Sequence, residues 1–209
     1  MKRLAIVAAA LLLFALLTHA VLAKGPLTLV DRDLTLYLAA HRSGWITRFT
    51  LAMNISHQTM VVLVATALAA GALVWRRRAR WAPLLLAIPS GMLANYGMKQ
   101  LVGRSRPVLD DPLLRLDTLS FPSGHAVAAT LFYGALLLVL LAHERRAAVR
   151  GAAAGLAIAM IAVVAASRVY LGVHHLSDVL AGLCLGVGWL VLCREGLDRW
   201  QRTLPAREA

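Results

Sequence analysis

Acidic residues and cysteine are both scarce in this chain of 209 residues. Ten Asp and Glu residues stand against 22 Lys and Arg residues, which leaves a net charge of +12. The two cysteines, Cys184 and Cys193, lie in one apolar segment. They form neither a disulfide framework nor a Cys-x-x-Cys pair, so they indicate nothing about the redox compartment. The few carboxylates offer no cluster that would hold a magnesium ion, and we expect neither a metal nor another cofactor.

Apolar residues, in contrast, are abundant. They make up 60% of the chain, and the mean hydropathy is +0.71, well above the usual values for a soluble domain. Most of the apolar segments approach the roughly 20 residues that cross a bilayer. We therefore predict an all-α, polytopic membrane protein with six transmembrane helices in one domain, residues 1–209. The six segments are Leu4–Ala23, Thr59–Trp75, Ala82–Met98, Gly124–Ala142, Gly151–Ala166 and Leu176–Cys193.

The basic residues orient this bundle. They lie between apolar runs and form no single stripe, so nucleic acid is not the expected partner. The first set, at one group of segment ends, contains 13 residues: Lys2, Arg3, Arg76, Arg77, Arg78, Arg80, Arg145, Arg146, Arg150, Arg194, Arg199, Arg202 and Arg207. The opposite ends carry nine: Lys24, Arg32, Arg42, Arg48, Lys99, Arg104, Arg106, Arg115 and Arg168. The positive-inside rule then makes the first set cytoplasmic, together with both termini.

The first apolar run and the segment that follows it are less regular. Lys2-Arg3 before an apolar run also fits a signal peptide, but the run is long and favours a retained helix. From Gly25 to Gln58 leucines alternate with Asp31, Arg32 and Asp33, which predicts a short amphipathic helix along the interface. His41 and His57 lie there without visible partners, so we interpret them as surface or interface residues and not as ligands.

Two features of the predicted helices bear on their packing. Pro89 lies in the middle of the third apolar segment and should kink it. The pairs Gly151/Gly155 and Gly182/Gly186 are small-xxx-small patterns, which let two helices approach closely.

The stretch Ser167–Asp178 concentrates charge between two apolar segments. It contains Arg168, two adjacent histidines and an aspartate, and ionisable groups at such positions indicate a functional site. His174 and Asp178 are four residues apart, which places them on one face if the segment is helical. A carboxylate beside an imidazole fixes its tautomer and strengthens it as a base or nucleophile.

Two further stretches fall on the same predicted outer side. Lys99 and Arg106 are separated by six residues. Phe121–His125 opens the fourth apolar segment, and a helix start of this kind presents free backbone N–H groups to an anion. Ser123 adds a hydroxyl donor, and His125 stands where it can give a proton. Three cations, a helix N-terminus and two histidines are the groups that phosphoryl transfer requires.

Taken together, these stretches resemble the three-part signature of the type 2 phosphatidic acid phosphatase superfamily. The matching parts are Lys99-(six residues)-Arg106-Pro107, Pro122-Ser123-Gly124-His125 and Ser167-Arg168-(five residues)-His174-(three residues)-Asp178, with every signature position filled. Arg104 and His175 are not signature positions, and the resemblance assigns them no role.

The resemblance implies a metal-independent membrane phosphatase with a phosphohistidine intermediate. His174 would be the nucleophile, Asp178 its partner and His125 the general acid and then base. Lys99, Arg106 and Arg168, with the Ser123 hydroxyl and the Gly124 N–H, would hold the phosphate. The site would face the periplasm or exterior at the membrane–water interface of a bacterial inner membrane. No obligate protein partner is evident.

A lipid phosphate is the expected substrate, because the site lies at the surface of an apolar body. We place undecaprenyl diphosphate first and phosphatidylglycerol phosphate second; lipid A phosphates are an alternative. A vanadium haloperoxidase would share the signature, but such proteins are soluble. A lipid transporter or scramblase without hydrolysis would need charges along a path, and here they gather at helix ends. A metal site of His174, His175 and Asp178 is disfavoured, because adjacent residues on a helix point about 100° apart.

Overall fold

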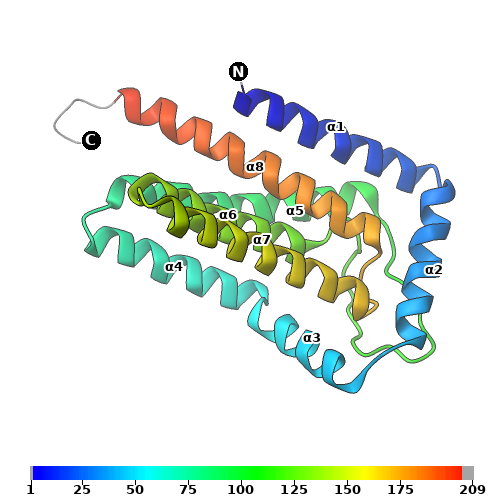
Figure 1. Ribbon diagram of the computed structural model, residues 1–209. Helices are drawn as coiled ribbons and strands as arrows, with labels where there is room; N and C mark the ends of the chain where they lie inside the picture. The colour runs from blue at the N-terminus through cyan, green and yellow to red at the C-terminus, as the bar shows by residue number, and fades with distance from the viewer. Residues whose placement is uncertain (1, 204–209) are drawn as a thin grey trace.

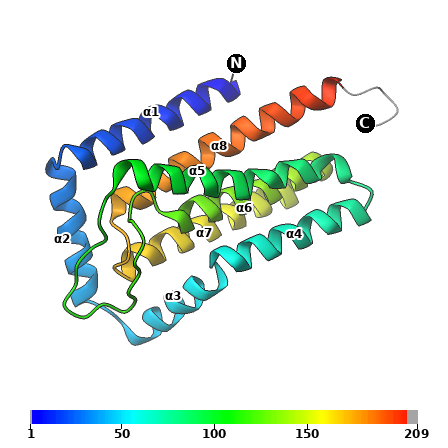
Figure 2. The ribbon, with the colours of Figure 1, turned by 180° about the vertical axis from the view of Figure 1, so that it is seen from behind.

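Every regular element in the described part of the chain, residues 2–203 of the computed structural model, is helical. Figures 1 and 2 show the long helices side by side, with the start of α1 and the last turns of α8 at the same end of the bundle. Arg207, counted above among the basic residues, lies outside the described residues. The elements are α1 (Lys2–Leu22), α2 (Pro26–Ala40), α3 (Gly44–Ser56), α4 (Thr59–Trp75), the 3₁₀ helix η1 (Ala79–Leu86), α5 (Ala87–Val102), α6 (Gly124–His143), α7 (Ala147–Tyr170) and α8 (Leu176–Thr203).

The prediction of an all-α membrane protein is confirmed, whereas the number of six spans is not. Four helices are long and apolar enough to cross a bilayer by themselves, namely α1, α6, α7 and α8. A fifth span results if α3 and α4 are taken as one broken span with a bend of 56°. The third apolar segment does not qualify, because it is divided between η1 and α5.

Proline explains that division. Pro83 lies inside the 3₁₀ helix, and α5 begins only at Ala87. Pro89 has no N–H for the carbonyl four residues before it, and proline is readily accepted in a first helical turn. The prediction that Pro89 kinks the middle of a helix is therefore wrong, because Pro89 belongs to the first turn of α5.

The centre of the molecule is the contact of α8 with α6. A Cβ on Gly182 would lie 2.7 Å from the carbonyl oxygen of Ser123, and one on Gly186 would lie 2.7 Å from Cβ of Thr130. Only glycine allows so close an approach, which confirms the small-xxx-small interpretation for this pair. Gly151 and Gly155 face open space, so the same interpretation is wrong for α7.

The segment between α1 and α4 forms two helices where one was expected. In both views α2 lies across the ends of the long helices, and α3 leads from it towards α4 (Figures 1 and 2). Leu34 and Leu38 of α2 pack against a small apolar cluster that includes Val169 and Val179. Asp31, expected on the polar face of an interfacial helix, is instead fully buried. Its environment is part of the site described below.

His57 is also buried, contrary to its interpretation as a surface or interface residue. Its side chain is 8% exposed, and Nε2 lies 2.7 Å from the hydroxyl of Tyr133 on α6. The bend between α3 and α4 turns the ring inwards. His41 at the end of α2 is exposed, as expected, and its Nδ1 contacts the Tyr37 carbonyl at 2.8 Å.

The two ends of the bundle differ in character. At one end Arg3 of α1 pairs with Glu195 and Asp198 of α8, and the guanidinium of Arg194 lies 4.2 Å from the ring centre of Trp81. The long loop between α5 and α6 lies at the opposite end, beside α2 (Figure 2). The sequence signature is gathered at this second end.

The glycine contact leads to a stability prediction. We expect Gly186→Ala to lower the melting temperature in detergent, because overpacking a tight contact costs about 1–3 kcal/mol. Gly155→Ala is the matched control on an open helix face, where alanine should stabilise by up to about 1 kcal/mol. Equal melting temperatures for the two variants would contradict the close packing of α8 on α6.

Candidate active site

The three signature segments are joined by backbone hydrogen bonds. The Ser120 N–H donates to the Arg104 carbonyl at 2.8 Å, and the Ser123 N–H donates to the Asp178 carbonyl at 2.9 Å. Gly172 makes the turn between α7 and α8 with φ +70°, and a Cβ there would lie 2.4 Å from Leu109 of the loop between α5 and α6. These bonds fix the starts of α6 and α8 relative to the loop after α5.

His174 lies in the turn before α8, and its side chain is almost completely buried. Its Nε2 lies 3.3 Å from Nη1 of Arg106. A guanidinium can only donate, so Nε2 accepts and Nδ1 carries the ring proton. On the Nδ1 side the Ser120 hydroxyl oxygen lies at 3.3 Å and Oδ2 of Asp178 at 3.5 Å. The lone pair of Nε2 therefore faces away from Asp178.

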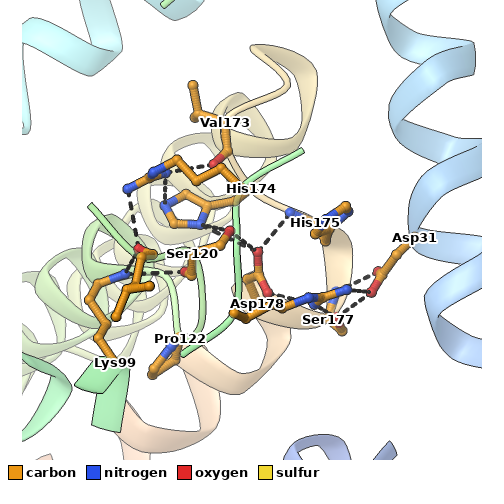
Figure 3. A network of polar contacts seen from close by, with 12 residues as sticks. Asp31, Lys99, Ser120, Pro122, Val173, His174, His175, Ser177 and Asp178 are labelled. Atoms are coloured by element: carbon orange, nitrogen blue, oxygen red, sulfur yellow. Dashed lines mark hydrogen bonds and ion pairs between the residues drawn. The ribbon is translucent and has the colours of Figure 1, made fainter. Parts of the chain in front are cut away.

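Four protein groups hold the Asp178 carboxylate, which is itself fully buried. Figure 3 shows it between His174 and Asp31, with Ser120 and His175 beside it. Oδ1 accepts a hydrogen bond from Arg104 Nη1 at 2.6 Å. Oδ2 accepts from the Ser120 hydroxyl and from the His175 N–H, the latter at 2.9 Å, and faces the imidazole of His174. A buried carboxylate with this many donors stays ionised.

Burial sets the protonation of His174. It lowers the pKa of the imidazole to about 4, although the nearby Asp178 acts in the opposite direction. The ring is consequently neutral at pH 7, and its Nε2 lone pair, which here accepts from Arg106, points away from Asp178. The pKa of Arg106 is also lowered by burial, but an arginine keeps its charge at any pH of interest.

Lys99 and Arg106 are held by main-chain oxygens of the loop between α5 and α6. The Lys99 ammonium donates to the carbonyls of Leu119 at 2.5 Å and Ser120 at 3.2 Å. Arg106 donates to the Thr118 carbonyl at 2.7 Å and to the Val173 carbonyl at 2.6 Å. Neither cation has a carboxylate at ion-pair distance among residues 2–203, so both charges remain free to meet an anion.

Three other signature side chains carry buried polar atoms that have no partner within the described residues. They are the hydroxyl of Ser123, Nε2 of His125, and Nε and Nη2 of Arg168. The remaining terminal nitrogen of Arg168, Nη1, donates to Oδ1 of Asn54 at 2.8 Å. Buried donors normally have partners, because leaving one unpaired costs about 1–3 kcal/mol. Donors gathered at a helix start suit an anion with several oxygens.

A cavity of about 680 Å³ lies at this end of the molecule, between α5, α6 and the loop that joins them. Five signature residues line it: Lys99, Arg106, Gly124, His125 and His174. Ser123, Arg168 and Asp178 are fully buried and do not line it. The structure thus brings all eight predicted residues to one end, five at the cavity surface and three behind it.

Several residues of this region were not singled out by the sequence analysis. Ser120 contacts both His174 and Asp178, and Asn54 holds Arg168. His57, which the sequence analysis interpreted as a surface or interface residue, also lines the cavity. Asn95 donates to the Pro122 carbonyl at 3.2 Å. None of them lies in a recognisable spacing, although Ser120 immediately precedes the Phe121–His125 motif. Their places follow only from the packing of α3, α5 and α6.

The side chains described above do not form a metal-binding arrangement. In the part of the chain from residue 2 to residue 203, no three His, Cys, Asp or Glu side chains converge as metal ligands do. Asp178 is occupied by four protein groups. The alternative of a metal held by His174, His175 and Asp178 therefore has no geometric support.

A buried imidazole backed by a carboxylate thus faces a cation-lined cavity at the end of a helical membrane bundle, an arrangement suited to an anionic ligand. Comparison with known proteins assigns the family: the model of the PAP2 superfamily matches residues 80–202. The chain therefore belongs to the PAP2 superfamily.

Individual relatives are named as phosphatases. Phosphatidylglycerophosphatase B of Bacillus subtilis is 28% identical over 179 residues, which cover 85% of this chain and 88% of the relative. Decaprenylphosphoryl-5-phosphoribose phosphatase of Mycobacterium tuberculosis is 36% identical over 120 residues, 53% of this chain and 58% of that protein.

Solved structures share the fold. The crystal structure of a transmembrane PAP2-type phosphatidylglycerolphosphate phosphatase from Bacillus subtilis has a TM-score of 0.85 at 24% identity and covers 95% of this chain and 98% of its own. LpxE of Aquifex aeolicus has a TM-score of 0.59 at 18% identity and covers 79% of this chain and 95% of its own.

Proposed function

We propose that this protein is an integral membrane lipid phosphatase that works through a phosphohistidine on His174. The observation that carries the proposal is the pairing of two histidines at one cavity. His174 and His125 both line the 680 Å³ space, together with Lys99 and Arg106, and Asp178 lies directly behind His174. Nucleophile, acid and phosphate-binding cations are then present at a single site.

In the first step Nε2 of His174 attacks the phosphorus atom. A P–N bond forms, the bond from phosphorus to the leaving oxygen breaks, and His125 gives a proton to that oxygen. The Nδ1 proton stays on the ring, which becomes positively charged. Asp178 stabilises this charge and holds the ring in the reactive tautomer.

In the second step a water molecule attacks the phosphorus atom. His125, now unprotonated, takes a proton from the water, the P–N bond breaks, and inorganic phosphate leaves with His174 neutral again. Lys99, Arg106 and the Gly124 N–H line the cavity and stabilise the equatorial oxygens in both steps. We assign the same role to Arg168 and the Ser123 hydroxyl, whose unpartnered donors lie behind the cavity wall. Loss of one such donor typically costs about 3–4 kcal/mol of barrier.

A lipid is the substrate class that the surroundings of the cavity favour. Tyr96 lines the cavity and is 61% exposed, and on the same helix Leu93 and Leu101 are 70% and 79% exposed. Apolar side chains at such positions are solvated by hydrocarbon in a membrane protein. A lipid chain lying against α5 would bring its phosphate to His174.

Among lipids the comparisons change the ranking. The sequence placed undecaprenyl diphosphate before phosphatidylglycerol phosphate. The relative that covers most of this chain is named for phosphatidylglycerophosphate hydrolysis, so we now place phosphatidylglycerol phosphate first. A polyprenyl phosphate compound is second, since the mycobacterial relative is named for one.

We further propose that the site faces the outside of a bacterial inner membrane. The end opposite the site contains the start of α1, the connection between α6 and α7 and the turn after α4 (Figure 1), and these segments carry Arg3, Arg145 and the basic segment 76–80. The positive-inside rule places that end, and both termini, in the cytoplasm.

Phosphate release from a lipid panel tests the function. Purified protein in micelles should release phosphate from phosphatidylglycerol phosphate faster than from undecaprenyl diphosphate, phosphatidic acid or p-nitrophenyl phosphate. Activity should persist in excess EDTA, because three fixed cations do the work usually given to magnesium. Vanadate should inhibit, since it copies the five-coordinate transition state.

The control preparation is His174→Ala, which should release no phosphate from any lipid. Preference for the water-soluble ester over every lipid would contradict the lipid proposal. Full loss of activity in EDTA, restored by magnesium, would contradict metal independence.

Cysteine labelling in intact cells tests the orientation. Arg78 and Asp110 are both exposed and lie at opposite ends of the bundle. An impermeant maleimide should label Asp110→Cys but not Arg78→Cys. The parent protein, treated with the same reagent, gives the background labelling of Cys184 and Cys193. The reverse pattern would overturn the proposed orientation.

A further inference from the structure

Arg104 has the most unusual environment of the residues that the signature leaves unexplained. It follows Gly103, which ends α5 in the left-handed conformation with φ 64°. Its side chain is 12% exposed and reaches two carboxylates far apart in the sequence, those of Asp31 and Asp178. Nη2 lies 2.9 Å from Oδ2 of Asp31 on α2, and Nη1 lies 2.6 Å from Oδ1 of Asp178 on α8.

Asp31 is fixed just as firmly on its side. It is fully buried, and its Oδ1 accepts the backbone N–H of Ser177 at 2.9 Å. Its Oδ2 accepts the Ser177 hydroxyl as well as Arg104. The first turn of α8 is therefore capped by a carboxylate from another helix, a stabilising place for a negative charge. Figure 3 shows Asp31, Ser177 and Asp178 in one continuous network.

This network determines how the Asp178 carboxylate is turned. Arg104 engages Oδ1, so Oδ2 is the oxygen left to face Nδ1 of His174. Without the guanidinium, Oδ1 would lose its charged partner, and only the Ser120 hydroxyl and the His175 N–H, both on Oδ2, would hold the carboxylate beside His174. Two buried carboxylates would also share the site without a cation between them, which is strongly unfavourable.

We propose that Arg104, held in place by Asp31, is a positioning residue for catalysis. It orients Asp178 so that Oδ2 faces the His174 imidazole, and it touches neither the substrate nor the reacting atoms. The inference rests on the function proposed above. It extends the functional unit to α2, which lies outside the three-part signature.

An arginine suits this role better than a lysine. Its planar fork can donate to two carboxylates from two different nitrogens while the charge stays fixed between them. A lysine would bring one compact charge that cannot keep both distances. Arg104→Lys should therefore keep the fold but not the orientation of Asp178.

The first experiment compares two aspartates on one helix. Asp31→Asn removes the charge that holds Arg104, whereas Asp33→Asn changes an exposed carboxylate, 70% accessible, two residues away. We expect Asp31→Asn and Arg104→Lys to lower kcat by roughly 10- to 100-fold, the range found for groups that orient a ligand from behind. KM should stay within about twofold, because the phosphate-binding groups are untouched, and Asp33→Asn should match the wild type.

The second experiment is a double-mutant cycle of Arg104→Gln and Asp178→Asn, read by single-turnover phosphoenzyme formation. If Arg104 acts through Asp178, the double variant should be no slower than Asp178→Asn alone. A structural role would instead lower the rate by the same factor in both backgrounds. Melting temperatures of all four proteins establish that each is folded, and Asp31→Asn replaces Arg104→Gln in the cycle if the latter does not fold.

The outcomes separate the two proposals. The positioning role would be refuted if Asp31→Asn and Arg104→Lys kept the wild-type kcat, or if the losses in the cycle were fully additive. The proposed function would still stand in that case, provided that His174→Ala is inactive. Near-normal activity of His174→Ala would refute the proposed function itself.

Discussion

A buried negative charge at Asp178 is the constraint on which the rest of this end of the molecule depends. An ionised carboxylate out of water must be paired and hydrogen-bonded, or it costs several kcal/mol. Here Arg104 donates from the loop after α5, and the Ser120 hydroxyl donates from the segment before α6. The third donor, the His175 N–H, lies just before the start of α8. Each partner is part of a segment that also carries a signature residue. Satisfying one carboxylate thus brings the signature side chains together.

Helix packing delivers those segments to the same place. Gly182 of α8 lies against the Ser123 carbonyl at the start of α6, and the Ser123 N–H donates to the Asp178 carbonyl. A larger residue at position 182 would separate the two helix starts. The start of α6 is therefore held beside the imidazole of His174 by three features together: the small residue, the backbone hydrogen bond and the buried ion pair.

Much of this arrangement could be predicted from local sequence, and the exceptions have a physical explanation. The spacing of His174 and Asp178 predicted that the two side chains meet, although the helix begins only at Leu176 and His174 stands in the turn before it. The common location of Lys99, His125 and His174 followed from counting spans and charges, although the third span is interrupted by η1. The burial of Asp31 could not be predicted, since a charge among leucines is usually solvated, and its partner Ser177 lies 146 residues away. The burial of His57 could not be predicted either, because it depends on the bend between α3 and α4.

The central claim is that the phosphoryl group passes through His174, and mapping the phosphoenzyme tests it most directly. A ³²P-labelled lipid phosphate is mixed with protein and quenched in alkali, where phosphohistidine survives, and the labelled peptide is identified by mass spectrometry. The account predicts label on His174 in the wild-type protein and in His125→Ala supplied with a good leaving group, and none in His174→Ala. Label on another residue, or turnover by His174→Ala, would contradict it.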